Sequence, residues 1–131
     1  MFIDASALTA ILVGEAGSLE LAGRMQRGRP LMTSPIAVWE TSAAVARILG
    51  LPVSPARQVV FDYLQAAEIE LAAIPPEAAT LAIEAFDRYG KGRHPAQLNM
   101  GDCFAYACSR HFGEPLMFKG GDFPLTDIVP A

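Results

Sequence analysis

Cysteine is scarce in this sequence, and other features that mark particular classes of protein are absent. Only two cysteines, Cys103 and Cys108, occur among the 131 residues. They do not form a disulfide framework, and we expect both to be buried thiols. No uninterrupted apolar run reaches the roughly 18 residues that span a bilayer, and the chain does not open on a basic, apolar leader. We therefore expect a cytoplasmic protein without a membrane partner.

Low-complexity tracts, linkers and internal repeats are also absent from the sequence. The ten prolines and eleven glycines are scattered, 52% of the residues are hydrophobic and 18% are charged. This composition is typical of a chain with a packed core and not of a disordered one. Because 131 residues is also a usual size for one domain, we expect a single domain over residues 1–131.

Short apolar segments alternate with helical patterns along the chain. Strands are expected at residues 1–3, 31–33, 69–74, 115–118 and 128–129. Helices are expected at about residues 6–13, 18–27, 36–49, 54–67, 75–89 and 102–112. The alternation predicts an α/β domain with a mainly parallel sheet and helices on both faces. In such folds ligands bind outside the carboxyl ends of the strands.

Four acidic residues occupy positions from which they can meet at one end of such a sheet. Asp4 follows the first strand, Asp102 begins the last long helix and Asp122 follows the strand at 115–118. Glu40 lies in the first turns of its helix and can point toward the same end. Each acid also has a simpler interpretation: Asp4 and Asp102 as helix caps, Glu40 as a solvated surface residue and Asp122 as a turn residue.

Carboxylates brought within a few ångströms of one another repel and become protonated unless a cation lies among them. Oxygen-only ligands suit hard divalent ions such as Mg²⁺ or Mn²⁺, and such an ion can activate water and neutralise phosphate charge. Ser6 either hydrogen-bonds a neighbouring acid or helps to cap the first helix. No cysteine–histidine cluster has zinc-site spacing, and we interpret His94 as a loop residue and His111 as a helix-end residue.

Four segments of the chain carry these acids in a recognisable context. They are MFIDASAL at the start, VWETSAAVARI in the middle, LNMGDCFAYACSR late in the chain and PLMFKGGDFPLTDI near the end. In sequence, order and spacing they resemble the PIN-domain ribonucleases, and within them the VapC-type toxins of toxin–antitoxin pairs. The resemblance covers essentially the whole chain, and its two late segments are the most specific.

The resemblance implies a PIN domain, a three-layer α/β/α sandwich, that cleaves RNA as an endoribonuclease with Mg²⁺ or Mn²⁺. It places Asp4, Glu40, Asp102 and Asp122 on the family's acidic positions, with the first and third as the main metal ligands. It also implies a VapB-type antitoxin that blocks the pocket, and a homodimer that assembles further with that antitoxin. Relatives often have Asn or Asp where this chain has Gly121, so a second metal position lacks that side chain.

The net charge of −4 by itself argues against a nucleic-acid partner, because such proteins are more often basic. Setting the four site acids aside leaves ten acidic and ten basic residues, so the remaining surface need not repel RNA. Eight of the ten basic residues are arginine, which suits bidentate phosphate contacts. The basic clusters at 24–29 and 88–93 are either solvated helix faces or contacts with the RNA backbone.

Two other functions compete with the nuclease. One is a catalytically inactive PIN-like module that only binds a partner; Gly121 leaves it open, although all four acids are present. The other is a different Mg²⁺-binding α/β protein. A phosphatase of the haloacid-dehalogenase type needs Asp-x-Asp where this chain has Asp4-Ala5-Ser6, and a receiver domain needs paired acids there.

Overall fold

A four-stranded parallel sheet forms the centre of the computed structural model, which describes all of residues 1–131. The strands are β1 (Phe2–Ile3), β2 (Met32–Thr33), β3 (Glu70–Leu71) and β4 (Leu116–Met117), in the spatial order β3-β2-β1-β4. β1 pairs with β2 and β4, and β2 pairs with β3, all in parallel. The carboxyl ends of the four strands therefore lie along one edge of the sheet.

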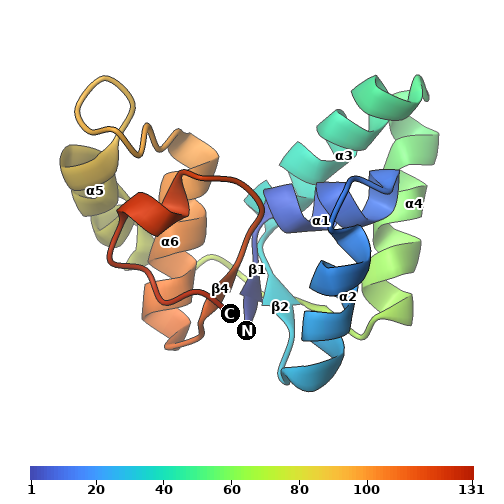
Figure 1. The fold of residues 1–131 in the computed structure, drawn as a ribbon, viewed down its shortest axis with the longest axis horizontal. Helices are drawn as coiled ribbons and strands as arrows, with labels where there is room; N and C mark the ends of the chain where they lie inside the picture. Colours follow the sequence, from blue (N-terminus) through green and yellow to red (C-terminus); the bar gives the residue numbers. More distant parts are fainter.

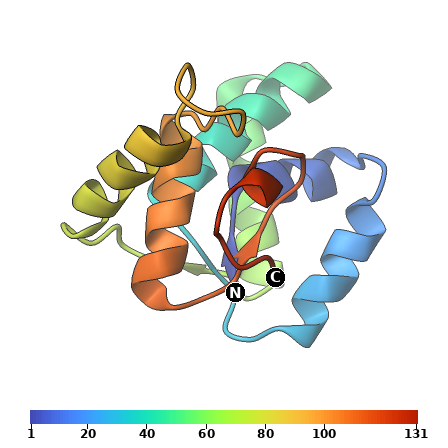
Figure 2. The same cartoon turned by 60° about the vertical axis from the view of Figure 1, so that its left-hand side comes forward.

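Helices cover both faces of the sheet. They are α1 (Ala5–Val13), α2 (Ser18–Arg27), α3 (Pro35–Leu49), α4 (Val53–Ala66), α5 (Ala78–Tyr89) and α6 (Met100–Phe112). Helices α1 to α4 lie on one side, and α5 and α6 pack side by side on the other (Figures 1 and 2). The predicted three-layer α/β/α sandwich is confirmed. No helix combines the length and the apolar character needed to cross a membrane.

Neighbouring residues of each central strand pack into different cores, because successive side chains of a strand point to opposite faces. Ile3 and Met117 join the core formed with α1 to α4, whereas Phe2 and Leu116 join the core formed with α5 and α6. All four side chains are fully buried. Strands that are apolar on both faces are typical of parallel sheets enclosed by two helical layers.

Local residues set the start of α3 and the end of α1. Ser34 is the N-cap of α3, where its Oγ accepts a hydrogen bond from the backbone N–H of Ala37 at 3.1 Å, and Pro35 occupies the first turn. α1 ends at Gly14 with φ 70°, a left-handed conformation that glycine adopts without steric cost. The start of α3 is thereby fixed directly after β2, at the carboxyl edge of the sheet.

Two of the expected strands differ in the structure. The strand expected at 128–129 is absent, because this segment makes only an isolated bridge between Leu116 and Pro130. The strand expected at 69–74 is reduced to the two exposed residues of β3 at the edge of the sheet. In both places the backbone pairs with the sheet over too few residues to form the expected strand.

Replacing the central core residue Ile3 by alanine should lower the free energy of unfolding by about 2–5 kcal/mol, because it leaves a cavity between β1 and the α1–α4 layer. The matched control is Ile83→Ala, since Ile83 is 69% exposed on α5 and its loss should change stability by less than about 0.5 kcal/mol. Urea denaturation of both variants measures the difference. Equal losses in the two variants would show that β1 is not central to the core.

Candidate active site

A cavity of about 460 Å³ opens at the carboxyl edge of the sheet. Three of the four predicted acids line it: Asp4 from the end of β1, Glu40 from α3 and Asp102 from α6. Asp122 is not among its lining residues. The structure thus brings together acids that are nearly 100 positions apart in the chain, and it leaves the fourth outside the cavity wall.

Asp4 is buried, 3% exposed, at the point where β1 passes into α1. Its backbone N–H donates to the carbonyl of Met117, which ties it to β4. Its Oδ2 accepts from the backbone N–H of Ser6 at 3.0 Å and from the Ser6 hydroxyl at 2.5 Å. Burial raises the pKa of Asp4. Asp4 is therefore a helix cap and a cavity residue at once.

Ser6 connects the Asp4 carboxylate to the backbone of the segment that follows β4. Its Oγ donates to Asp4 and accepts from the backbone N–H of Lys119 at 3.0 Å. Of the two roles considered for Ser6, hydrogen bonding to the neighbouring acid is the one the structure shows. The hydroxyl holds the segment that follows β4 close to the start of α1.

Asp102 occupies the third position of α6 and forms a reciprocal capping box with Asn99. The Asp102 N–H donates to Asn99 Oδ1, and the Asn99 N–H donates to Asp102 Oδ2, each at 2.9 Å. Burial, followed by the charges of Asp4 and Asp122, raises the pKa of Asp102 to about 6, although the hydrogen bond from Asn99 opposes the shift. No strand directly precedes α6, so Asp102 reaches the cavity through its helix end.

Glu40 faces the start of α6 and is accommodated by a glycine. A Cβ at Gly101 would lie 2.1 Å from Glu40 Oε1 and 2.3 Å from Oε2, so only glycine leaves room for the carboxylate where it stands. Glu40 makes no hydrogen bond to the protein. Burial first, and then the charges of Asp4 and Asp102, raise its pKa to about 7. A pKa this close to neutrality lets Glu40 gain or lose a proton around pH 7.

Asp122 stands apart from these three carboxylates. It is exposed at the start of the short 3-10 helix η1 (Phe123–Leu125), where its side chain makes no capping hydrogen bond. It is still close enough for its charge to help raise the pKa of Asp102. Gly121, beside it, has nothing within 4 Å of where a Cβ would stand. No side-chain hydrogen bond at the start of η1 holds Asp122, so the conformation of the backbone around residue 122 sets its position.

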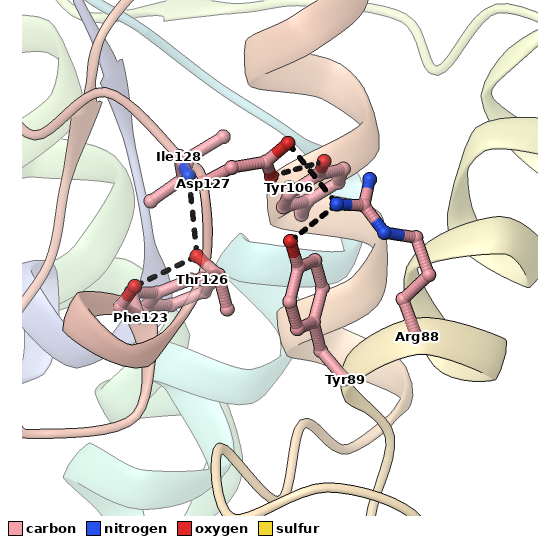
Figure 3. A network of polar contacts seen from close by, with 7 residues as sticks. All are labelled: Arg88, Tyr89, Tyr106, Phe123, Thr126, Asp127 and Ile128. Carbon is pink, nitrogen blue, oxygen red and sulfur yellow. Dashed lines mark hydrogen bonds and ion pairs between the residues drawn. The ribbon is translucent and has the colours of Figure 1, made fainter.

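A polar network fastens the segment after Asp122 to α5 and α6 (Figure 3). The Tyr106 hydroxyl donates to Asp127 Oδ1 at 2.7 Å, and Arg88 pairs with Asp127 Oδ2 at 3.4 Å. Arg88 also donates to the Tyr89 hydroxyl at 2.6 Å. The hydrogen bond from Tyr106 is the main cause that lowers the pKa of Asp127, which keeps this carboxylate ionised.

Thr126 forms local hydrogen bonds within the segment that follows Asp122. The Thr126 hydroxyl donates to the carbonyl of Phe123 at 2.7 Å and accepts from the N–H of Ile128 at 3.2 Å (Figure 3). The Phe123 side chain is buried in the α5–α6 core. Sequence analysis assigned no role to this network, whose Tyr106 and Asp127 both lie within the segments that carry the family resemblance.

The cavity contains further residues to which the sequence analysis gave no role in the site, chiefly Arg47, Lys119 and Glu15. Lys119 donates through Nζ to Glu15 Oε2 at 2.5 Å and to the carbonyl of Ala16 at 2.8 Å. Arg47 lies on the same face of α3 as Glu40, seven residues later, a spacing that could have placed it at the site.

Cysteine and histidine contribute nothing to the cavity. Cys103 and Cys108 are free, buried thiols as predicted, and burial raises the pKa of each to about 11. His94 lies in the loop before α6, where its Nδ1 accepts from the N–H of Ala96 at 3.1 Å and its ring meets the edge of Tyr89. His111 is exposed near the end of α6.

The donors around the cavity fit a hard divalent cation by their chemistry. Asp4, Glu40 and Asp102 offer carboxylate oxygens, the ligands that Mg²⁺ and Mn²⁺ prefer. Their raised pKa values show that their charges are not balanced by the surrounding protein. No three Asp, Glu, His or Cys side chains stand close enough to hold one ion together. The cavity therefore fits a divalent ion in the type and charge of its ligands, and the carboxylates are too far apart to hold one ion together as they stand.

Comparisons with known proteins place this chain in a family. The model of the PIN domain matches residues 1–129, so the chain belongs to the PIN-domain family. Ribonuclease VapC of Mycolicibacterium smegmatis is 39% identical over 129 residues, which cover 98% of both chains. Ribonuclease VapC30 of Mycobacterium tuberculosis is 36% identical over 98% of this chain and 96% of its own. Within the PIN-domain family, the chain is a member of the VapC ribonucleases.

A solved structure has the same fold. The crystal structure of Mycobacterium tuberculosis VapC20, a toxin that cleaves the sarcin–ricin loop, matches with a TM-score of 0.76 and covers 99% of this chain and 97% of its own. The two sequences are 20% identical. The likeness confirms the PIN fold that the sequence predicts.

The acidic cavity should make the metal-free protein less stable at alkaline pH. The native pKa values of Glu40, about 7, and Asp102, about 6, exceed their unfolded values, so the folded state holds protons more tightly. The free energy of unfolding should therefore rise as the pH falls from 8 through these values, and level off below the unfolded values near pH ~4.

Glu40→Gln tests this origin of the pH dependence, because the amide keeps the shape and removes the charge. In EDTA at pH 8 the variant should gain on the order of 1 kcal/mol over wild type, a figure that allows for solvent screening of a partly exposed group. The gain should shrink at pH 5.5. Glu84→Gln, at an exposed position on α5, is the control. Thermal unfolding curves that shift equally for both variants would refute the assignment.

Proposed function

We propose that residues 1–131 form one PIN domain that acts as a metal-dependent endoribonuclease, the toxin of a toxin–antitoxin pair. Asp4 and Asp102 are the main ligands of a Mg²⁺ or Mn²⁺ ion, and Glu40 and Asp122 complete the site. A VapB-type antitoxin inhibits it by covering the cavity. The protein works in the cytoplasm as a homodimer that assembles further with this antitoxin.

The cavity lined by three carboxylates is the observation that carries this proposal. Acids from β1, α3 and α6 converge there with raised pKa values, in a chain that belongs to the VapC ribonucleases. A bound divalent ion supplies a water of lowered pKa and neutralises phosphate charge. Membership of the family supports RNA as the substrate.

Residues of the protein orient the two metal-binding aspartates and accept a proton during cleavage. Ser6 and Asn99 each hold one oxygen of an aspartate, Asp4 Oδ2 and Asp102 Oδ2 respectively. Both aspartates are thus oriented before any ligand binds, which is typical of metal sites. Glu40 has no protein hydrogen bond, and its carboxylate oxygens accept the proton that the attacking water loses.

The decisive experiment combines Asp4→Asn and Asp102→Asn with metal binding and RNA cleavage. Each variant should lose cleavage of RNA in Mn²⁺ by roughly 100-fold or more, and calorimetry should show weaker Mn²⁺ binding. Asp62→Asn, at an exposed position on α4 where Asp62 only accepts from Gln58, is the control. Unchanged cleavage in both variants would refute the nuclease site. A wild type that binds antitoxin and cleaves no RNA would instead favour the inactive partner-binding module.

Gly101→Ala probes the room that Glu40 needs. The new Cβ would collide with the Glu40 carboxylate, which can swing away because it is the end of a flexible side chain. We expect a folded protein whose Mn²⁺ affinity falls about tenfold or more. Gly23→Ala in α2, where nothing lies within 4 Å of the new Cβ, is the control. Wild-type affinity in Gly101→Ala would mean that Glu40 takes no part in metal binding.

A further inference from the structure

Arg47 is the feature of the cavity that the proposed chemistry does not use. It lies in the last turn of α3 and lines the same cavity as Glu40. Residues 40, 44 and 47 all line this cavity, because they share one face of the helix. The seven residues between Glu40 and Arg47 correspond to about 10 Å along the helix axis.

Arg47 is also free to bind a ligand. It is exposed and makes no hydrogen bond or ion pair within the protein. The other cation of the cavity, Lys119, is held by Glu15 and by a backbone carbonyl. Three arginines elsewhere on the surface are engaged by acids: Arg29 with Glu68, Arg88 with Asp127 and Arg93 with Asp87. Apart from Arg47, the remaining arginines without an ion pair lie outside the cavity. Arg47 is the one unpaired positive charge in a cavity with four acids in its wall.

We propose that Arg47 binds the backbone phosphate of the RNA that neighbours the cleaved phosphodiester. This inference rests on the proposed function and assigns a substrate contact within it. The spacing from Glu40 separates the guanidinium from the carboxylates, which the cleaved phosphate must approach. A guanidinium offers paired donors that match two phosphate oxygens. Its charge offsets the repulsion between an acidic cavity and a polyanion.

A purely structural role for Arg47 makes a different prediction. A cation in the last turn of a helix interacts favourably with the helix dipole. If that were its only role, Arg47→Ala would lower the melting temperature slightly and leave RNA binding unchanged. The two roles are therefore separated by measurements on RNA.

The first measurement is RNA binding without metal, where no cleavage occurs. A fluorescein-labelled 20-nucleotide RNA of mixed sequence is titrated in EDTA at several salt concentrations with wild type, Arg47→Ala and Arg57→Ala. Arg57 is an exposed arginine on α4 that lies over the Phe61 ring and outside the cavity. Arg47→Ala should bind more weakly, and the slope of log affinity against log salt should shrink by about 0.7, as expected for one lost phosphate contact. Arg57→Ala should match wild type.

The second measurement locates the phosphate. In the shortest RNA that the wild type cleaves in Mn²⁺, each phosphate in turn is replaced by a neutral methylphosphonate. Arg47→Ala should lower kcat/KM roughly ten- to hundredfold on the unmodified RNA, mainly through KM, and Arg47→Lys should recover part of the loss. At the phosphate next to the cleaved bond, the methylphosphonate should slow wild type but not slow Arg47→Ala further.

The outcomes distinguish this inference from the function on which it rests. If wild type cleaves RNA and Arg47→Ala matches Arg57→Ala in affinity, salt slope and kcat/KM, the contact is refuted while the nuclease stands. If every methylphosphonate affects wild type and Arg47→Ala alike, the contact with a neighbouring phosphate is likewise refuted. If wild type neither binds nor cleaves RNA, the proposed function fails and this inference fails with it.

Discussion

The burial of Asp4 at the carboxyl end of β1 is the constraint around which the cavity is organised. β1 lies between β2 and β4, so a side chain that follows it stands in the middle of the sheet edge. Its backbone is tied to Met117 of β4, and its carboxylate is tied through Ser6 to the backbone of Lys119. Glu40 on α3 and Asp102 on α6 line the same cavity, and the two helices belong to the layers on opposite faces of the sheet.

This arrangement has a cost that the rest of the fold must offset. Three carboxylates share one cavity. Burial raises the pKa of each, and the charges of neighbouring acids raise the pKa of Glu40 and Asp102 further. Two fully enclosed apolar cores, one on each face of the sheet, supply the opposing stabilisation. A divalent cation bound among these carboxylates would offset the unfavourable burial of their charges.

Much of this structure could be predicted from the sequence, for reasons that are local. The strand at β1 and the parallel α/β pattern follow from apolar runs and from the alternation of strands and helices. The positions of Asp4 and Glu40 follow once parallel strands are assumed, because Asp4 directly follows β1 and Glu40 lies in the helix that follows β2, whereas Asp102 reaches the cavity through the start of α6. The lining position of Arg47 and the hydrogen bonds of Tyr106 to Asp127 depend on how distant helices pack, which no local pattern encodes. The exposed position of Asp122 depends on the backbone of a loop, as does the missing strand at 128–129.

The central claim is that the cavity holds a divalent ion between Asp4 and Asp102. Anomalous diffraction from a crystal of the wild-type protein soaked in Mn²⁺ tests it directly, because the manganese signal locates the ion without reference to activity. The account predicts an anomalous peak within coordination distance, about 2.0–2.2 Å, of carboxylate oxygens of both aspartates. A soaked crystal with no peak in the cavity, or with manganese bound only elsewhere on the surface, would contradict it.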